Sequence, residues 1–191
     1  MNTTDFVKVW DLPLRIFHWL LVVGFFIAYL TEDDFLTVHV WAGYLVTGLI
    51  IFRLVWGFTG NQYARFGNFL CNPIQSINYI KDAIDLKAKR YIGHNPAGAA
   101  MIVLLLVSLL LTCITGLAVY GADQGAGPLA SIVGSENEDF WEDTHEFFAN
   151  FTLLLVFVHV AGVIFESYLH KENLVKSMWN GYKKSIDSSK N

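Results

Sequence analysis

The sequence predicts an all-α protein, a transmembrane four-helix bundle with two short interfacial helices on the cytoplasmic side. Three observations favour this fold. Of the 191 residues, 54% are hydrophobic and only 16% are charged, whereas soluble domains average about 45–50% apolar and about 25% charged residues. Four stretches are long enough to cross a bilayer, which takes about 20 helical residues. The connection between the first and second stretches and the connection between the third and fourth would lie on the same side of the membrane. Neither contains Lys or Arg.

The four predicted spans have the same character. None of them alternates between apolar and polar residues, so helices are expected rather than strands of a barrel. No internal repeat divides the chain, and we expect residues 1–191 to form one domain. The spans are predicted at residues 12–31, 36–58, 97–120 and 143–168.

The basic residues predict the orientation of the helices. All 13 Lys and Arg fall at the N-terminus, around the middle connection or in the C-terminal tail, and the other two connections are acidic. Because loops that stay in the cytoplasm are enriched in Lys and Arg, both termini are expected in the cytoplasm.

Two further stretches have the pattern of helices that lie in the membrane interface. The first is predicted to start at Asn72-Pro73, an N-cap residue followed by proline at the first helical position. Its apolar face is formed by Ile74, Ile77, Ile80 and Ile84. The second starts at Asn173, and its apolar residues are Leu174, Met178, Trp179 and Tyr182. Lysines occupy the other face of each stretch, as an interfacial helix requires.

The two cysteines, Cys71 and Cys113, are isolated in the sequence. Their number and spacing exclude a thiolate zinc or iron–sulfur site and the Cys-x-x-Cys-His attachment of a c-type haem. No nucleic-acid partner is expected, and lipid is the predicted surroundings of the chain.

Histidines within the predicted spans are the candidate functional residues, because an ionisable side chain in a membrane is costly. His145 and His159 are 14 residues apart on the fourth helix. Fourteen helical steps return to within about 40° of the starting direction and advance about 21 Å along the axis. The fourth helix therefore offers two ligands on one face at two depths.

Histidines on the first two helices match these depths. His18 is early in the first helix, towards the inner side, and His39 begins the second helix, near the outer side. The pattern pairs His18 with His159 and His39 with His145. Two histidines on facing helices are a common way to hold haem iron in a bundle, so two haems are predicted.

Two glycines near these histidines give weaker support to the prediction of haem sites. Gly43 and Gly162 follow His39 and His159 by about one turn, where they would leave room for a flat macrocycle, although glycine also serves ordinary helix packing. His94 and His170 fall outside the pairs. They are expected to be polar residues at the inner surface, and a role in proton exchange stays open.

Several stretches, taken in order along the chain, resemble the bacterial cytochrome b561 family, which is similar to the b-type cytochrome subunits of nickel–iron hydrogenases and formate dehydrogenases. The matching stretches are Val9-Trp10-Asp11-Leu12-Pro13, Arg15-Ile16-Phe17-His18-Trp19, His39-Val40-Trp41-Ala42-Gly43-Tyr44, residues 53–60, Ala64-Arg65-Phe66, residues 93–98 and residues 170–181.

The resemblance implies two non-covalent b-type haems in a multi-pass protein of the bacterial inner membrane. Its ligand pattern falls on His18 and His159 for the inner haem, and on His39 and His145 for the outer haem. It also implies electron transfer between the quinone pool and a redox partner at the periplasmic face. That partner would be a c-type cytochrome, or a hydrogenase or dehydrogenase subunit. The resemblance therefore favours an electron-transfer subunit of a respiratory complex over a complete enzyme.

Two arginines are candidates for further contacts. Arg15 precedes His18 by three residues and would meet a haem propionate, unless it serves only as a positive anchor at the inner surface. Arg53 lies deeper in the second helix and could contact a propionate or a quinone carbonyl.

Two other functions compete with this interpretation. A stand-alone membrane oxidoreductase would pass electrons between quinone and a small molecule such as superoxide, and turnover by the isolated chain would favour it. A transporter or sensor could use the histidines to bind a transition metal. Against this, no acid within the spans is placed to pair with these histidines across the core except Glu146 and Glu166, both close to the predicted membrane boundaries.

Overall fold

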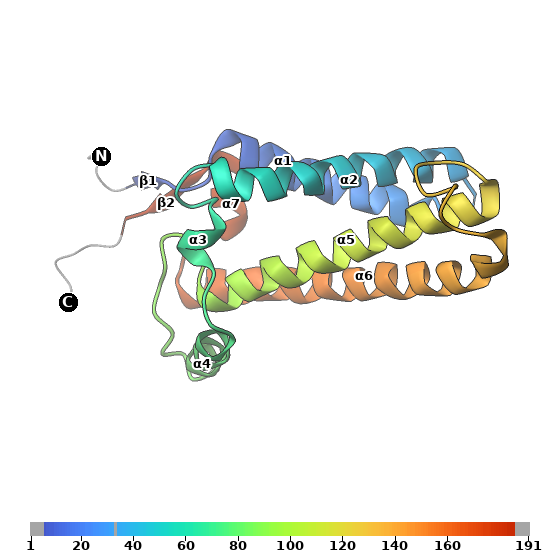
Figure 1. Ribbon diagram of the computed structural model, residues 1–191. Coiled ribbons are helices and arrows are strands. Elements are labelled where there is room, and N and C mark those ends of the chain that lie inside the picture. Colours follow the sequence, from blue (N-terminus) through green and yellow to red (C-terminus); the bar gives the residue numbers. More distant parts are fainter. Residues whose placement is uncertain (1–5, 33, 186–191) are drawn as a thin grey trace. The chain divides into compact units, whose positions relative to one another are not determined.

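The computed structural model describes residues 6–32 and 34–185. In these ranges the chain is predominantly helical, with one pair of short strands (Figure 1). The elements in chain order are β1 (Phe6–Lys8), α1 (Leu12–Leu30), α2 (Leu36–Thr59), α3 (Phe66–Phe69), α4 (Pro73–Ile84), α5 (Pro96–Gln124), the short 3₁₀ helix Ser135–Asn137, α6 (Glu138–Leu169), α7 (Leu174–Asn180) and β2 (Tyr182–Lys184).

The four long helices are each long and apolar enough to cross a membrane. Their bounds differ from the predicted spans mainly at the connection between α5 and α6. Helix α5 continues to Gln124, and α6 begins at Glu138 rather than near Asp143. Glu138 and Asp139 occupy the first turn of α6, where acidic side chains favour the positive end of the helix dipole. The prediction of an all-α protein with four transmembrane helices is confirmed.

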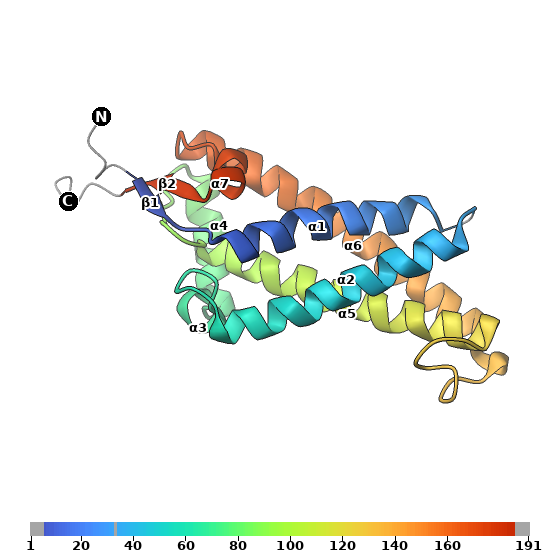
Figure 2. The same cartoon turned by 90° about the horizontal axis from the view of Figure 1, so that it is seen from above.

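The chain divides into two compact units, and every long helix contributes a segment to both. Within the described ranges, the first unit comprises residues 6–18, 53–102 and 158–185, and the second comprises residues 19–32, 34–52 and 103–157. The short elements β1, α3, α4, α7 and β2 all belong to the first unit. Figure 2 allows each segment to be followed by colour.

The second unit has an apolar core to which all four long helices contribute. Phe25 of α1, Val46 and Ile50 of α2, and Leu109 of α5 are buried together, and Leu153 of α6 packs against them. Many other apolar side chains of these helices are exposed. Outward-facing apolar side chains are what a bilayer requires, because lipid tails are as apolar as the side chains themselves.

Helix α4 has the two faces expected of an interfacial helix. Asn72 caps it by accepting a hydrogen bond from the backbone N–H of Ile74, and Pro73 is its first residue, as the sequence predicts. Tyr79 and Ala83 are buried against the protein. The four isoleucines of the other face are exposed: Ile74, Ile77, Ile80 and Ile84.

The two strands join the segment before α1 to the segment after α7. They pair antiparallel, with Val7 opposite Lys183 (Figure 1). The carbonyl of Gly181 accepts hydrogen bonds from the backbone N–H groups of Val9 and Trp10, at 2.8 and 3.1 Å. Gly181 ends α7 with a φ of 89°, and a Cβ at this position would lie 2.6 Å from the carbonyl oxygen of Trp10.

Replacement of this glycine is expected to destabilise the first unit. Gly181→Ala forces a left-handed conformation on alanine, which costs about 1–2 kcal/mol, and adds a clash with the Trp10 carbonyl. The measurement is the midpoint of unfolding in detergent. Gly67→Ala is the matched control, because a Cβ at Gly67 meets nothing within 4 Å. Equal midpoints for the two variants would contradict the prediction.

Candidate functional site

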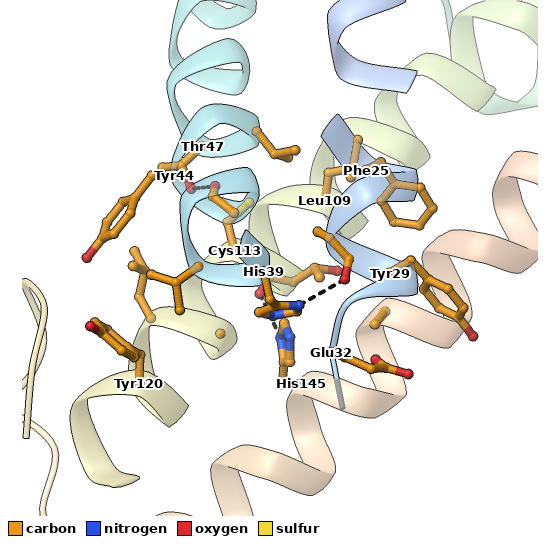
Figure 3. A pocket seen from close by; sticks show the side chains of 18 residues that line it. Phe25, Tyr29, Glu32, His39, Tyr44, Thr47, Leu109, Cys113, Tyr120 and His145 are labelled. Carbon is orange, nitrogen blue, oxygen red and sulfur yellow. Dashed lines mark hydrogen bonds between the residues drawn. The ribbon is translucent and has the colours of Figure 1, made fainter. Parts of the chain in front are cut away.

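His39 and His145 face each other in the second unit. His39 lies in the first turn of α2 and His145 in the second turn of α6. Their ring centroids are 6.0 Å apart and their planes are at 90° (Figure 3). The structure therefore brings together the pair that the sequence predicts for the outer site.

The Nδ1 atom of each ring is bonded to a backbone carbonyl. His39 Nδ1 lies 2.9 Å from the carbonyl oxygen of Ala28, and His145 Nδ1 lies 3.0 Å from that of Thr112. A carbonyl oxygen only accepts hydrogen bonds, so each Nδ1 must carry the proton. The Nε2 atom of each ring then keeps its lone pair, which is the form of histidine that binds a metal.

An apolar pocket surrounds the two rings (Figure 3). Phe25, Leu109 and Leu117 are among its lining residues. Gly43 also lines it, and a Cβ at Gly43 would meet nothing within 4 Å. The wall is therefore open one turn after His39, where the sequence analysis places clearance for a macrocycle.

These residues fit a b-type haem. The distance between the His39 and His145 ring centroids leaves room for a metal ion between the rings. It is close to the sum of two metal–nitrogen bonds of about 2 Å each and the half-widths of two imidazole rings. A haem supplies four nitrogens of its own and needs only two protein ligands. In the part of the chain that the structure describes, no three His, Cys, Asp or Glu side chains gather to form a metal site without such a cofactor.

The second histidine pair belongs to the first unit. His18 of α1 and His159 of α6 lie within electrostatic range of each other, and both rings are half-buried. A Cβ at Gly162, three residues after His159, would meet nothing within 4 Å. The predicted inner pair therefore stays a prediction: the two residues come from two helices of one unit, and there is open space beside His159.

Arg53 lies deep in the same unit as the inner pair. Its side chain is only 3% exposed and its guanidinium lies 4.6 Å from the centroid of the Phe66 ring. The Nη1 atom is buried and has no hydrogen-bond partner among the described residues. A buried donor without a partner is costly, so Arg53 is suited to bind an anionic or carbonyl oxygen of a ligand.

Arg15 has a structural partner. Its Nη1 donates a hydrogen bond to the backbone carbonyl of Trp179, which links α1 to α7. Each of the two candidate arginines also has a buried donor without a hydrogen-bond partner among the described residues, Nε in Arg15 and Nη1 in Arg53. Arg15 already uses another donor for the Trp179 carbonyl, so Arg53 is the stronger candidate for a ligand.

His94 is half-buried on the connection before α5. Its ring lies between those of Trp10 and Phe69, with a centroid distance of 4.6 Å to each, and its Nδ1 atom is buried without a partner among the described residues. Burial lowers the pKa of His94 to about 3, and the positive charges of Arg53 and Lys183 contribute. The ring is therefore neutral at physiological pH. Its aromatic neighbours come from distant parts of the sequence, which the pattern around residue 94 does not reveal.

Hydroxyl side chains near His145 were not expected from the sequence. The Thr115 hydroxyl lies 3.2 Å from His145 Nδ1, and Ser108 and Thr152 form a buried hydrogen bond of 2.6 Å between α5 and α6. The available signal is the recurrence of Ser and Thr along an otherwise apolar helix, at positions 108, 112 and 115. These side chains hold α5 at the distance from α6 that the His145–Thr112 hydrogen bond needs.

Four apolar helices with histidines facing each other are typical of a membrane-embedded b-type cytochrome. A comparison with protein families agrees, since the model of the family described as prokaryotic cytochrome b561 matches residues 9–181. The chain belongs to this family, which confirms the resemblance seen in the sequence. It is thus a multi-pass membrane protein of electron transfer that binds b-type haem.

Several curated proteins are similar over almost the whole chain. A probable Ni/Fe-hydrogenase B-type cytochrome subunit of Rhodobacter capsulatus is 26% identical, and the alignment covers 93% of this chain and 81% of that protein. The similarly named protein of Cupriavidus necator is 27% identical over 92% of this chain and 86% of its own length. A probable Ni/Fe-hydrogenase 1 B-type cytochrome subunit of Escherichia coli K12 is 28% identical, with 92% and 89% covered. No solved structure matches the chain.

The absence of a side chain at Gly116 allows the His145 ring to take its position. A Cβ at Gly116 would lie 2.8 Å from Cε1 of His145. Gly116→Ala should therefore displace this ring and weaken haem binding about 10–100-fold, the usual effect of disturbing the groups that orient a metal ligand. Haem titration into the apoprotein measures the effect. Gly48→Ala, where a Cβ meets nothing within 4 Å, is the control; unchanged haem binding by Gly116→Ala would contradict the prediction.

Proposed function

We propose that this protein carries electrons across the bacterial inner membrane through two b-type haems. His18 and His159 hold the inner haem, and His39 and His145 hold the outer haem. The observation that carries the proposal is the geometry of His39 and His145, whose rings are 6.0 Å apart and whose Nδ1 atoms are both committed to carbonyl oxygens.

The protein's part is ligation, orientation and exclusion of water. When bound, each haem supplies a one-electron couple between ferric and ferrous iron. The carbonyls of Ala28 and Thr112 hold the rings of His39 and His145 and make their Nε2 atoms better donors. The apolar wall keeps water from the outer site. One site in each unit divides the passage through the low-dielectric interior into shorter steps.

Arg53 is proposed to bind a propionate of the inner haem or the carbonyl of a quinone. Its burial and its unpartnered Nη1 atom support this role. Arg15 is the weaker candidate, since part of its guanidinium already serves the Trp179 carbonyl.

The electrons are proposed to pass between the quinone pool and a redox protein at the periplasmic face, with both termini of this chain in the cytoplasm. The positions of Lys and Arg along the sequence support this orientation. The similar proteins are named as hydrogenase subunits, which favours a hydrogenase as the partner. A c-type cytochrome or a dehydrogenase subunit would also suit an acidic outer face, because opposite charges steer association. The chain then acts as a subunit of a respiratory complex.

The haem content of the purified chain tests the proposal. A reduced-minus-oxidised spectrum with pyridine-haemochrome quantitation should give two b haems per polypeptide. His39→Ala and His159→Ala should each remove mainly one of them, because each breaks only one pair. His170→Ala is the control and should keep both.

Other haem contents would contradict the proposal in part or as a whole. One haem per chain in the wild type would mean that one of the pairs is wrong. A folded protein that takes up no haem would refute the proposal as a whole. Quinone reduction by superoxide with the isolated chain would support the stand-alone oxidoreductase instead of the subunit.

A further inference from the structure

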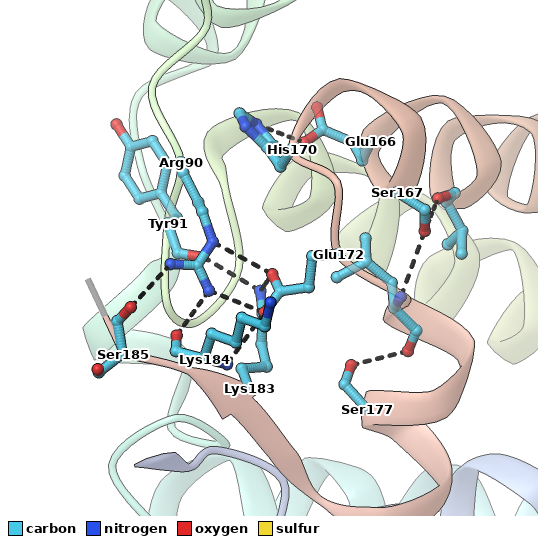
Figure 4. A network of polar contacts seen from close by, with 12 residues as sticks. Arg90, Tyr91, Glu166, Ser167, His170, Glu172, Ser177, Lys183, Lys184 and Ser185 are labelled. Carbon is cyan, nitrogen blue, oxygen red and sulfur yellow. Dashed lines mark hydrogen bonds and ion pairs between the residues drawn. The ribbon is translucent and has the colours of Figure 1, made fainter. Parts of the chain in front are cut away.

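Three titratable side chains meet at the end of α6 in the first unit. The Tyr79 hydroxyl donates to Oε2 of Glu166 at 3.1 Å, and Nε2 of His170 lies 3.2 Å from the same oxygen. The Tyr79 hydroxyl and His170 Nε2 are 3.5 Å apart. Figure 4 shows Glu166 and His170 facing each other across one turn of the helix. The side chains of Glu166 and His170 are each 14% exposed, so the cluster is enclosed but still reached by water.

Glu166 differs from the other enclosed acid nearby. Glu172 is paired with Arg90 at 2.8 Å and with Lys183 at 3.3 Å (Figure 4). Among the described residues, Glu166 has no such pair with Lys or Arg, and its partners are a tyrosine and a histidine. A carboxylate neutralised by a fixed cation stays ionised, whereas one beside an imidazole can exchange a proton with it. Chains of acids and histidines at membrane depth often serve as proton relays.

The cluster is close to the inner histidine pair. Glu166 follows His159 by seven residues on α6, which places it within about 20° of the same face and about 10 Å further along the helix. The Tyr79 hydroxyl also lies 3.3 Å from the backbone carbonyl oxygen of Lys89, on the connection that leads to His94. At an effective dielectric constant of about 20, a unit charge about 10 Å away changes a proton-binding constant roughly tenfold.

We propose that Tyr79, Glu166 and His170 form a proton-exchange site whose occupancy is coupled to the oxidation state of the inner haem. The inference rests on the proposed haem between His18 and His159. Reduction of a haem held there, by one electron from the redox partner, would draw one proton from water to the Glu166–His170 pair. The positive charge of the proton then compensates the negative charge of the electron on the inner haem. When the electron leaves, the proton returns to water.

The groups that face the pair decide where the exchangeable proton resides. Burial and the Glu166 carboxylate raise the pKa of Tyr79, so its hydroxyl stays protonated and acts as a fixed donor. Tyr91 packs on the Tyr79 ring with a centroid distance of 5.7 Å. Lys183 lies within electrostatic range of Glu166 but is ion-paired with Glu172. The exchangeable proton therefore belongs to Glu166 and His170.

Redox titration of the haem-loaded protein at several pH values tests the coupling. Because reduction raises the affinity of the pair for a proton, the midpoint potential of the inner haem should fall as the pH rises. A tenfold change in the proton-binding constant gives a total fall of about 59 mV, the tenfold equivalent for one electron. The inner haem is resolved by its own spectrum in His39→Ala, which keeps only the inner pair.

Variants of Tyr79, Glu166 and His170 test whether these residues cause the pH dependence of the midpoint potential. Glu166→Gln should flatten it while the haem content is unchanged, and Tyr79→Phe should reduce it. Glu146→Gln is the control, because Glu146 is an exposed acid of α6 in the second unit. If Glu166→Gln loses haem, His170→Asn is measured in its place, since it removes the imidazole and keeps the carboxylate.

The results separate this inference from the proposed function. An inner haem whose potential does not depend on pH overturns the coupling and leaves the cytochrome intact. An unchanged slope in both Glu166→Gln and His170→Asn overturns the assignment to this cluster. Absence of the inner haem from the wild-type spectrum overturns the His18–His159 pair, and the coupling with it.

Discussion

An imidazole buried in a membrane must find a partner for each of its two ring nitrogens, and the second unit is organised around this constraint. Ala28 is in the last turn of α1, and its carbonyl oxygen accepts from His39 as well as from the backbone N–H of Thr31. Thr112 lies inside α5, where its carbonyl is already used by the helix. Gly116 removes the side chain that would keep His145 from that carbonyl.

The sequence predicts the elements of this arrangement better than its contacts. Hydropathy locates the four helices, and the 14-residue spacing on α6 places two histidines at two depths, because both depend only on local periodicity. The carbonyls of Ala28 and Thr112 could not be predicted, since every residue has a carbonyl and only the packing of helices selects one. The enclosure of His94 by Trp10 and Phe69 likewise depends on segments distant in sequence.

The two units surround their histidine pairs differently. The wall around His39 and His145 is largely apolar, with hydroxyl groups of α5 behind one ring. The unit that contains His18 and His159 also holds the buried Arg53, within electrostatic range of Asp11. A fixed positive charge favours whichever state of a neighbouring redox centre carries one more electron. Haems bound at the two pairs would therefore have different potentials although their ligands are the same.

The polar structure at the ends of the first unit explains how a ligand is kept at its depth. A transmembrane helix in lipid can slide or tilt at little cost, because its apolar surface meets the same surroundings in either position. Helix α1 is prevented from doing so by the hydrogen bonds of Val9 and Trp10 to Gly181 and by the bond from Arg15 to α7. His18 follows Arg15 by one turn, so these bonds fix its height relative to the end of α6 and hence to His159.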